Sequence, residues 1–161
     1  MKNLTVSLLA LFAVLMFSCK KDKQADTPNI YYIKASKNGV SWSTKSYSIF
    51  NAQKTKPDTI VVGGSLGEEH ISILAKLNSQ GNYIPDPAKT TFYTTIGQDV
   101  IMSTYTLDTT KDNTISVTKP SSSEIQGTFT LTFKKTGVAD SNPATVTFNQ
   151  GEFKSALSIA L

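Results

Sequence analysis

The sequence predicts an all-β fold, an antiparallel β-barrel or β-sandwich of about nine or ten strands, behind a signal peptide and a short flexible tether. Apolar and polar residues alternate from Ile30 onward, which is the period of strands with one face in a core and one in water. The chain contains 18 Ser and 21 Thr, and threonine favours strands. Its 161 residues are enough for one domain, which we place at residues 30–161.

The N-terminus has the pattern of an export signal. Lys2 is followed by a 14-residue apolar stretch, Leu4–Phe17, which ends at Ser18 and Cys19. Fourteen helical residues rise about 21 Å, which is less than the roughly 30 Å hydrocarbon core of a bilayer. We therefore interpret residues 1–18 as a cleaved signal peptide rather than as a membrane-spanning helix.

The junction between Ser18 and Cys19 resembles the lipobox of bacterial lipoproteins. The only Cys of the chain directly follows the apolar stretch, with a small residue before it and charged residues after it, although Met16 and Phe17 depart from the usual pattern. The resemblance implies transfer of a diacylglyceryl group to the thiol of Cys19, cleavage before this residue, acylation of the new N-terminus and attachment to a membrane of the cell envelope. We expect the outer membrane, on its periplasmic or its surface side. The alternatives are a simple secretory signal with an incidental Cys, or a buried Cys in a cytosolic domain.

Residues 19–29 are predicted to form the lipidated Cys and a flexible tether. The segment 20–29, KKDKQADTPN, carries no large apolar residue. The domain that follows contains no Cys, so its stability has to come from its core, and a chain of this length buries enough surface for that.

Alternation and turn residues together divide the domain into strands. In the clearest strand, Phe129, Leu131 and Phe133 share one face opposite a row of threonines. The same period predicts an inner face of Ile101, Ser103, Tyr105 and Leu107. The expected strands are 30–36, 40–44, 46–52, 59–65, 69–77, 90–96, 100–107, 113–119, 124–134, and a last hairpin of 144–149 with 152–159.

Five short segments are read as turns between these strands: Asn38-Gly39, Gly63-Gly64, Gly81-Asn82, Asp112-Asn113 and Asn149-Gln150-Gly151. The Asn-Gly pair is the strongest of them, because both positions of a two-residue hairpin turn require positive φ. In the last hairpin, alternation places Phe148 and Phe153 toward the core and Thr147 toward water.

Residues 65–77 allow two interpretations. Ser65 and Glu68 have the spacing of a helix capping box. As a strand, the segment places Ile71, Ile73, Ala75 and Leu77 on a single face, and β-branched residues favour strands. We predict the strand.

The order of several short motifs resembles a family of small lipoproteins typical of Bacteroidetes, which is described as a domain of unknown function. These motifs are Asn38–Trp42, Gly81–Tyr83, Gly127–Phe133 and Val146–Phe153, and the resemblance spans about residues 30–159. It implies an all-β, lipocalin-like barrel or sandwich on an envelope lipoprotein. It implies no reaction.

Composition excludes several classes of function. The formal charge of +4 comes from lysines alone and is spread thinly, whereas nucleic-acid binders concentrate basic residues and use arginine, so we expect no nucleic-acid partner. One Cys and one His exclude a Cys/His-rich metal site, and we expect no metal and no cofactor. No serine-nucleophile elbow or phosphate-binding loop is present, and the segment Gly63–Gly67 is interpreted as a flexible turn.

His70 is the only imidazole of the chain. On a strand, Glu68, His70 and Ser72 share a face, which is the beginning of a general-base or metal arrangement. Two possible ligands do not make a site, and a solvated strand end explains the pattern better. Glu68 and Glu69 point to opposite faces and therefore do not form a carboxylate pair. We predict no catalytic residue and no enzymatic activity.

Aromatic residues are the remaining candidates for binding. A stacking platform for sugar rings can be built from aromatic side chains with Ser, Thr and Asn as hydrogen-bonding partners. The available residues are Tyr31, Tyr32, Trp42, Tyr47, Tyr83, Tyr93 and Tyr105. Trp42, Tyr83 and Tyr93 are the ligand-binding candidates, and ordinary core packing is the competing explanation for each of them.

The sequence therefore predicts a monomeric, lipid-anchored envelope protein that acts as a non-enzymatic binding module. Its ligand would be a glycan, a small apolar molecule or a partner protein. The alternative is a structural or assembly accessory lipoprotein that binds no small ligand.

Overall fold

The computed structural model describes residues 31–50, 57–121, 123–137, 140–156 and 158–159. All regular secondary structure in these residues is β-strand. The strands are β1 (Tyr32–Lys37), β2 (Val40–Thr44), β3 (Ser46–Phe50), β4 (Thr59–Leu66), β5 (Glu69–Leu77), β6 (Tyr83–Pro85), β7 (Thr91–Ile96), β8 (Val100–Leu107), β9 (Thr114–Ser121), β10 (Glu124–Lys135), β11 (Thr145–Ala156) and β12 (Ser158–Ile159).

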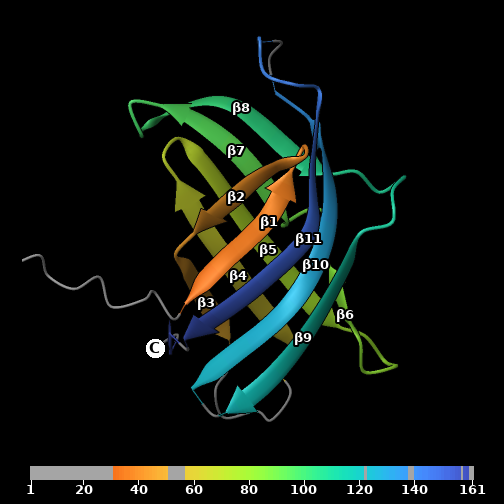
Figure 1. Ribbon diagram of the computed structural model, residues 1–161. Helices are drawn as coiled ribbons and strands as arrows, with labels where there is room; N and C mark the ends of the chain where they lie inside the picture. Colours follow the sequence, from red (N-terminus) through yellow and green to blue (C-terminus); the bar gives the residue numbers. More distant parts are fainter. Residues whose placement is uncertain (1–30, 51–56, 122, 138–139, 157, 160–161) are drawn as a thin grey trace, which may run out of the picture.

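The strands form one 12-stranded sheet in the order β12-β3-β4-β5-β7-β8-β10-β11-β1-β2, with β6 paired to β5 and β9 paired to β10. Every pair is antiparallel except β12 with β3. The sheet coils into a barrel-like body, but the path of paired strands stays open, with β12 and β2 at its ends (Figure 1). The predicted all-β antiparallel class is confirmed. The strands outnumber the expected nine or ten, and the unpredicted β6, of three residues, is too short to show a period.

The seam of the coiled sheet lies between β3 and β11. The hydroxyl of Ser46 donates to the carbonyl oxygen of Lys154 at 2.5 Å, and that of Ser48 donates to the carbonyl oxygen of Ala156 at 2.6 Å. Side-chain hydroxyls thus join two strands that do not pair as a regular ladder. Beyond Ala156, the two-residue β12 pairs with β3 directly.

Three hairpin turns and the β10–β11 connection lie at one end of the barrel. Strands β1, β4, β7 and β10 run toward this end and their successors return from it, as Figure 1 shows. We call it the hairpin end: it carries the β1–β2, β4–β5 and β7–β8 turns and the β10–β11 connection. Tyr31 and the last residues of β11 lie at the opposite end.

The β1–β2 turn is confirmed as a two-residue hairpin. Asn38 and Gly39 have φ values of 49° and 84°, and Lys37 pairs with Val40. Positive φ at both central positions matches the twist of the flanking strands. The Asn38 side-chain oxygen also accepts the backbone N–H of Thr147 at 2.8 Å, which ties the turn to β11.

The predicted turn at Gly63-Gly64 is wrong, because both glycines lie inside β4 and are buried. A Cβ on Gly63 would lie 2.7 Å from the carbonyl oxygen of Ile71, so close packing explains this residue. The turn comes at Gly67, with φ of 56°. The following segment is the predicted strand, β5, and not the alternative helix, because its burial alternates with period two.

The predicted hairpin at Asn149-Gln150-Gly151 is also wrong, because β11 is one continuous strand of 12 residues. Phe129 pairs with Gly151 while Leu131 pairs with Phe148, so β11 contains one extra residue there. Asn149 and Gln150 are both exposed, and Gln150 has φ of 52°. This is a β-bulge, which shifts the in-and-out alternation by one residue. The predicted burial of Phe148 and Phe153 is nevertheless confirmed.

A second bulge corrects the inner face predicted for β8. Thr94 pairs with Ser103 but Thr95 pairs with Ile101, which leaves Met102 as the extra residue. Ser103, Tyr105 and Leu107 are buried as expected, whereas Ile101 is exposed. Alternation alone does not reveal a bulge, because the residues before it keep the apolar pattern of an inner face.

Aromatic side chains fill the interior at the centre of the barrel. Phe92 lies 5.4 Å from Tyr105, 5.4 Å from Phe148 and 6.2 Å from Phe133 between ring centroids, and Trp42 packs edge-on against Phe148 at 5.6 Å. These are the spacings of aromatic rings in contact. The buried apolar core also includes Ile33, Ile60, Val62, Ile71, Ile73, Ile125, Phe129, Leu131, Val146 and Phe153.

We expect Phe148→Ala to destabilise the protein by about 3–5 kcal/mol, because it removes a ring that contacts three other rings. Thr147→Ala, on the neighbouring residue of the opposite face, should change the stability by less than about 1 kcal/mol. Urea unfolding of both variants measures the two values. Equal losses would contradict the face assignment on this side of the bulge.

Candidate functional site

A groove of about 270 Å³ lies on the outer face of the sheet, over β1, β9, β10 and β11. Its lining consists of Tyr32, Ser116, Thr118, Gln126, Gly127, Thr128, Glu152 and Phe153. The volume is slightly below the 300–1,000 Å³ that is usual for small-molecule sites, so the groove fits one small ligand unit.

Strand register places these side chains in two rows across the four strands. The first row is Tyr32, Lys154, Gln126 and Thr118, and the second is Lys34, Glu152, Thr128 and Ser116. Residues opposite one another in antiparallel strands have Cβ atoms about 5 Å apart. The two rows therefore set hydroxyl, amide, ammonium and carboxylate groups side by side along the groove.

Several polar groups in the groove are free to bind a ligand. Within the described part of the chain, the side chains of Ser116, Gln126 and Thr128 form no hydrogen bond with another residue. Gly127 and Phe153 complete the lining: Gly127 brings no side chain into the groove, and the buried Phe153 ring packs closely behind Gly127. A few polar groups around an apolar surface are typical of small-molecule sites.

The charges beside the groove balance one another. Lys34 and Glu152 form an ion pair of 3.0 Å, and Lys154 lies 3.4 Å from Glu124. The hydrogen bond to Glu152 raises the pKa of Lys34. The Lys34 ammonium also lies 5.1 Å from the ring centre of Tyr32. Two cations and two anions give the groove no preference for a charged ligand.

The three aromatic candidates predicted from the sequence do not come together. Trp42 is buried in the core and its indole N–H donates to Glu69 at 2.7 Å. Tyr83 is also buried and donates its hydroxyl to the carbonyl oxygen of Pro57 at 2.7 Å, and burial raises its pKa. Tyr93 lies on the outer face, stacked on His70 at 4.5 Å. Ser18 and Cys19 lie outside the described residues.

The other tyrosines have separate environments. Tyr31 donates to Glu124 at 3.2 Å, Tyr47 is exposed, and Tyr105 is buried. Tyr32 is the tyrosine that lines the groove. The remaining groove residues were not singled out by sequence reasoning, because a Thr, Ser or Gln on the wet face of a strand looks the same with or without a ligand. Only the register between distant strands brings them together.

His70 contacts Ser65 of the neighbouring strand β4. The Ser65 hydroxyl lies 2.8 Å from His70 Nδ1, and Thr95 Oγ1 lies 3.3 Å from His70 Nε2. Because the Thr95 hydroxyl donates its proton to Glu68, its oxygen can only accept from His70 Nε2, and in the neutral imidazole Nδ1 then accepts from Ser65. The bond from Thr95 lowers the pKa of Glu68. This chain of bonds joins the β4–β5 and β7–β8 hairpins. The described residues hold no cluster of three or more possible metal ligands.

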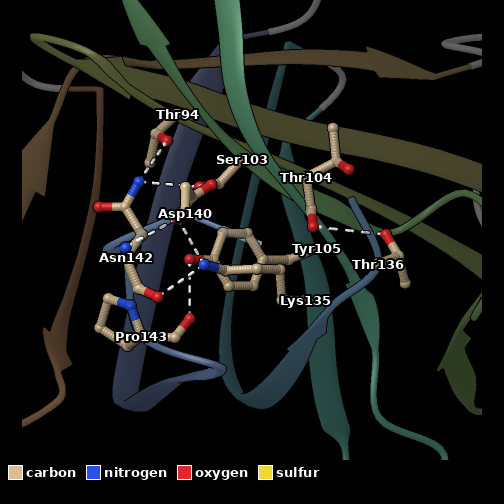
Figure 2. A network of polar contacts seen from close by, with 9 residues as sticks. All are labelled: Thr94, Ser103, Thr104, Tyr105, Lys135, Thr136, Asp140, Asn142 and Pro143. Carbon is tan, nitrogen blue, oxygen red and sulfur yellow. Dashed lines mark hydrogen bonds and ion pairs between the residues drawn. The ribbon is translucent and has the colours of Figure 1, made fainter. Parts of the chain in front are cut away.

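A second polar network attaches the β10–β11 connection to β8 (Figure 2). At its centre, the carboxylate of Asp140 accepts hydrogen bonds from Lys135 at 2.5 Å, from the backbone N–H of Asn142 at 2.7 Å and from Ser103. Lys135 and Asp140 are both largely buried. Pro143 accepts the hydroxyl of Tyr105 at 2.9 Å. These bonds fasten the connection over the inner face of β8, which makes the network a structural one.

The fold and the groove together define an all-β domain with a shallow polar site on the outside of its sheet. Residues 29–156 match the model of a domain of unknown function, DUF6252, and the chain belongs to this family. The comparison with curated proteins found no match, and the comparison with solved structures found none either. Among the described residues, no helix is long and apolar enough to cross a membrane.

We expect Asp140→Asn to lower the free energy of unfolding at neutral pH and to make it depend less on pH in the acidic range. The bonds from Lys135, from Ser103 and from the N–H of Asn142 lower the pKa of Asp140 from 3.8 to about 2. Because the folded-state pKa lies below the unfolded value, the carboxylate stabilises the fold above pH 4, and this contribution disappears as the pH falls toward 2. Urea unfolding at pH 7, 4 and 2.5 measures the difference between the two proteins. A constant difference across this range would contradict the assignment.

Proposed function

We propose that this chain is an envelope lipoprotein of the kind found in Bacteroidetes, and that its domain binds a neutral glycan in the outer groove without catalysing a reaction. The observation that carries the proposal is the groove itself. Its free hydroxyl and amide groups lie beside a tyrosine ring.

The chemistry of the lining favours a sugar over other small ligands. A pyranose presents hydroxyl groups at its edge and C–H groups on its faces. Ser116, Gln126 and Thr128 supply donors and acceptors for the hydroxyls, and Glu152 supplies a strong acceptor. The Tyr32 ring offers a flat apolar surface for a sugar face. Balanced charge around the groove argues against an anionic or a cationic ligand.

The packed interior argues against a small apolar ligand at the centre of the barrel. A lipocalin-like site needs empty volume inside the sheet, whereas here five aromatic rings occupy the middle at contact distances. Loss of one such ring from a core, as in Phe→Ala, costs about 3–5 kcal/mol, so packing of this kind resists opening. We therefore place the ligand on the outside.

The lipid anchor follows from the N-terminal sequence. Signal, Cys19 and a polar segment precede the family domain, which begins at residue 29. One acyl chain binds a bilayer only marginally, and two or three hold a protein there stably. Attachment through Cys19 to the outer membrane would keep the groove within reach of envelope glycans.

Cys19→Ala is expected to abolish lipid attachment, because the thiol is the acceptor of the diacylglyceryl group. Metabolic labelling with a radioactive fatty acid should mark the wild-type protein and leave the variant unlabelled, and the variant should retain its signal peptide on a gel. Equal labelling of both proteins would end the lipoprotein proposal.

For the groove, we expect Tyr32→Ala to weaken glycan binding about fivefold or more, since loss of one stacking contact costs about 1 kcal/mol. Calorimetric titration with neutral oligosaccharides, chosen from an array screen, measures the dissociation constant. Tyr47→Ala is the matched control, because Tyr47 is an exposed tyrosine on β3, away from the groove. An equal loss in the control, or no binding by the wild-type protein, would contradict the proposal and favour an accessory role.

A further inference from the structure

Exposed apolar residues gather at the hairpin end. The described residues include eight large hydrophobic side chains that are exposed, and six of them lie in or beside the hairpin turns there. Val40 is on the β1–β2 hairpin and Leu66 on the β4–β5 hairpin. The β7–β8 hairpin carries Ile96, Val100, Ile101 and Met102, which are 41–60% exposed. Exposed apolar residues that are grouped in this way mark an interaction site more often than scattered ones do.

Polar contacts hold the three hairpins together as one surface. Glu69, at the start of β5, accepts hydrogen bonds from Trp42 and Lys37 of the β1–β2 hairpin. Glu68, in the β4–β5 turn, accepts from Thr95 and from the backbone N–H of Gln98. Figure 1 shows the β4–β5 and β7–β8 turns projecting on the same side of the barrel. The exposed apolar residues therefore lie on hairpin turns that hydrogen bonds and an ion pair hold in place relative to one another.

The charged groups near the tips make no attractive surface for anions. The Lys37 ammonium is paired with Glu69, and Lys135 is paired with Asp140. Glu68 and Asp99, on the tips themselves, are acidic. Contact with an anionic surface is thus disfavoured, whereas an electrically neutral apolar phase suits these side chains.

The chain that precedes the described residues is long enough to let this end reach a membrane. Described structure begins at Tyr31, at the opposite end of the barrel. The twelve residue-to-residue steps from Cys19 to Tyr31 span at most about 40 Å. A 12-residue strand such as β10 is also about 40 Å long, and a coiled sheet tilts its strands, so the barrel is shorter than that. A domain anchored at Cys19 can therefore turn its hairpin end toward the same bilayer.

We propose that the hairpin end is a membrane-contact surface, which inserts Ile96, Val100, Ile101 and Met102 of the β7–β8 hairpin into the interfacial region of a lipid bilayer with neutral headgroups. The argument that the tether lets this end reach the bilayer rests on the proposed lipid anchor at Cys19. The apolar contact with the bilayer does not depend on that anchor. Contact at this end adds a second, weak attachment to the first and fixes which way the outer groove faces.

The test uses the mature chain, residues 19–161 with Cys19→Ser, so that no acyl chain contributes. Co-sedimentation with phosphatidylcholine vesicles should detect binding, and the double variant Ile101→Asp with Met102→Asp should reduce the bound fraction about tenfold or more. Ile84→Asp is the matched control, because Ile84 is 51% exposed on β6, away from the hairpin end. Binding should persist in 0.5 M salt.

Absence of vesicle binding by the unmodified mature chain would overturn the proposal, as would equal loss in the Ile84 control or binding confined to anionic vesicles. Concentration-dependent dimers that the double variant abolishes, without vesicle binding, would assign the surface to a second copy of the chain instead. None of these outcomes depends on fatty-acid labelling at Cys19, so failure of the anchor and failure of this surface can be told apart.

Discussion

The bulge in β11 is the feature on which the rest of the fold depends. This strand pairs with β10 on one side and β1 on the other, and the register shifts against both partners at the same place. Without the extra residue, Phe148 and Phe153 would point to opposite faces, since their spacing is odd. With it, one strand supplies inward side chains along its whole length and bends enough for the sheet to coil. The bulge at Gln150 therefore lets β11 contribute buried side chains to the core on both sides of the bulge, Phe148 before it and Phe153 after it.

A filled interior decides where a ligand can bind. Rings from β2, β7, β8, β10 and β11 meet in the middle, and the hydroxyls of Ser46 and Ser48 at the seam join β3 to β11. Recognition is thereby confined to the outer face and to the ends. The two surfaces that we propose, the outer groove for a glycan and the hairpin end for a bilayer, differ in chemistry as these two ligands require. One is polar, charge-balanced and hollowed, and the other is apolar and made of projecting turns.

Period-two alternation was sufficient to predict the all-β class, most strand positions and the burial of Phe129, Leu131 and Phe133, because half-buried strands repeat every two residues. It failed where the chain departs from regular pleating. Gln150 and Met102 interrupt the alternation as bulges, and Gly63-Gly64 looks like a turn although its role is close packing. The groove was beyond prediction for another reason. Ser116 and Tyr32 are 84 residues apart in the chain, and only strand pairing makes them neighbours.

Core packing and the outer groove meet at Gly127. A Cβ at this position would lie 2.6 Å from the Phe153 ring and 2.0 Å from the carbonyl oxygen of Ser116. Glycine thus lets the ring fill the space beneath β10 and lets β9 approach closely from the side. The same missing side chain leaves the Gly127 backbone in the lining of the groove, with the buried Phe153 ring packed behind it. Any larger residue at this position would have to displace both β9 and Phe153. The shape of the groove at Gly127 is therefore fixed by the packing of the barrel, whereas the polar side chains around it are not constrained in this way.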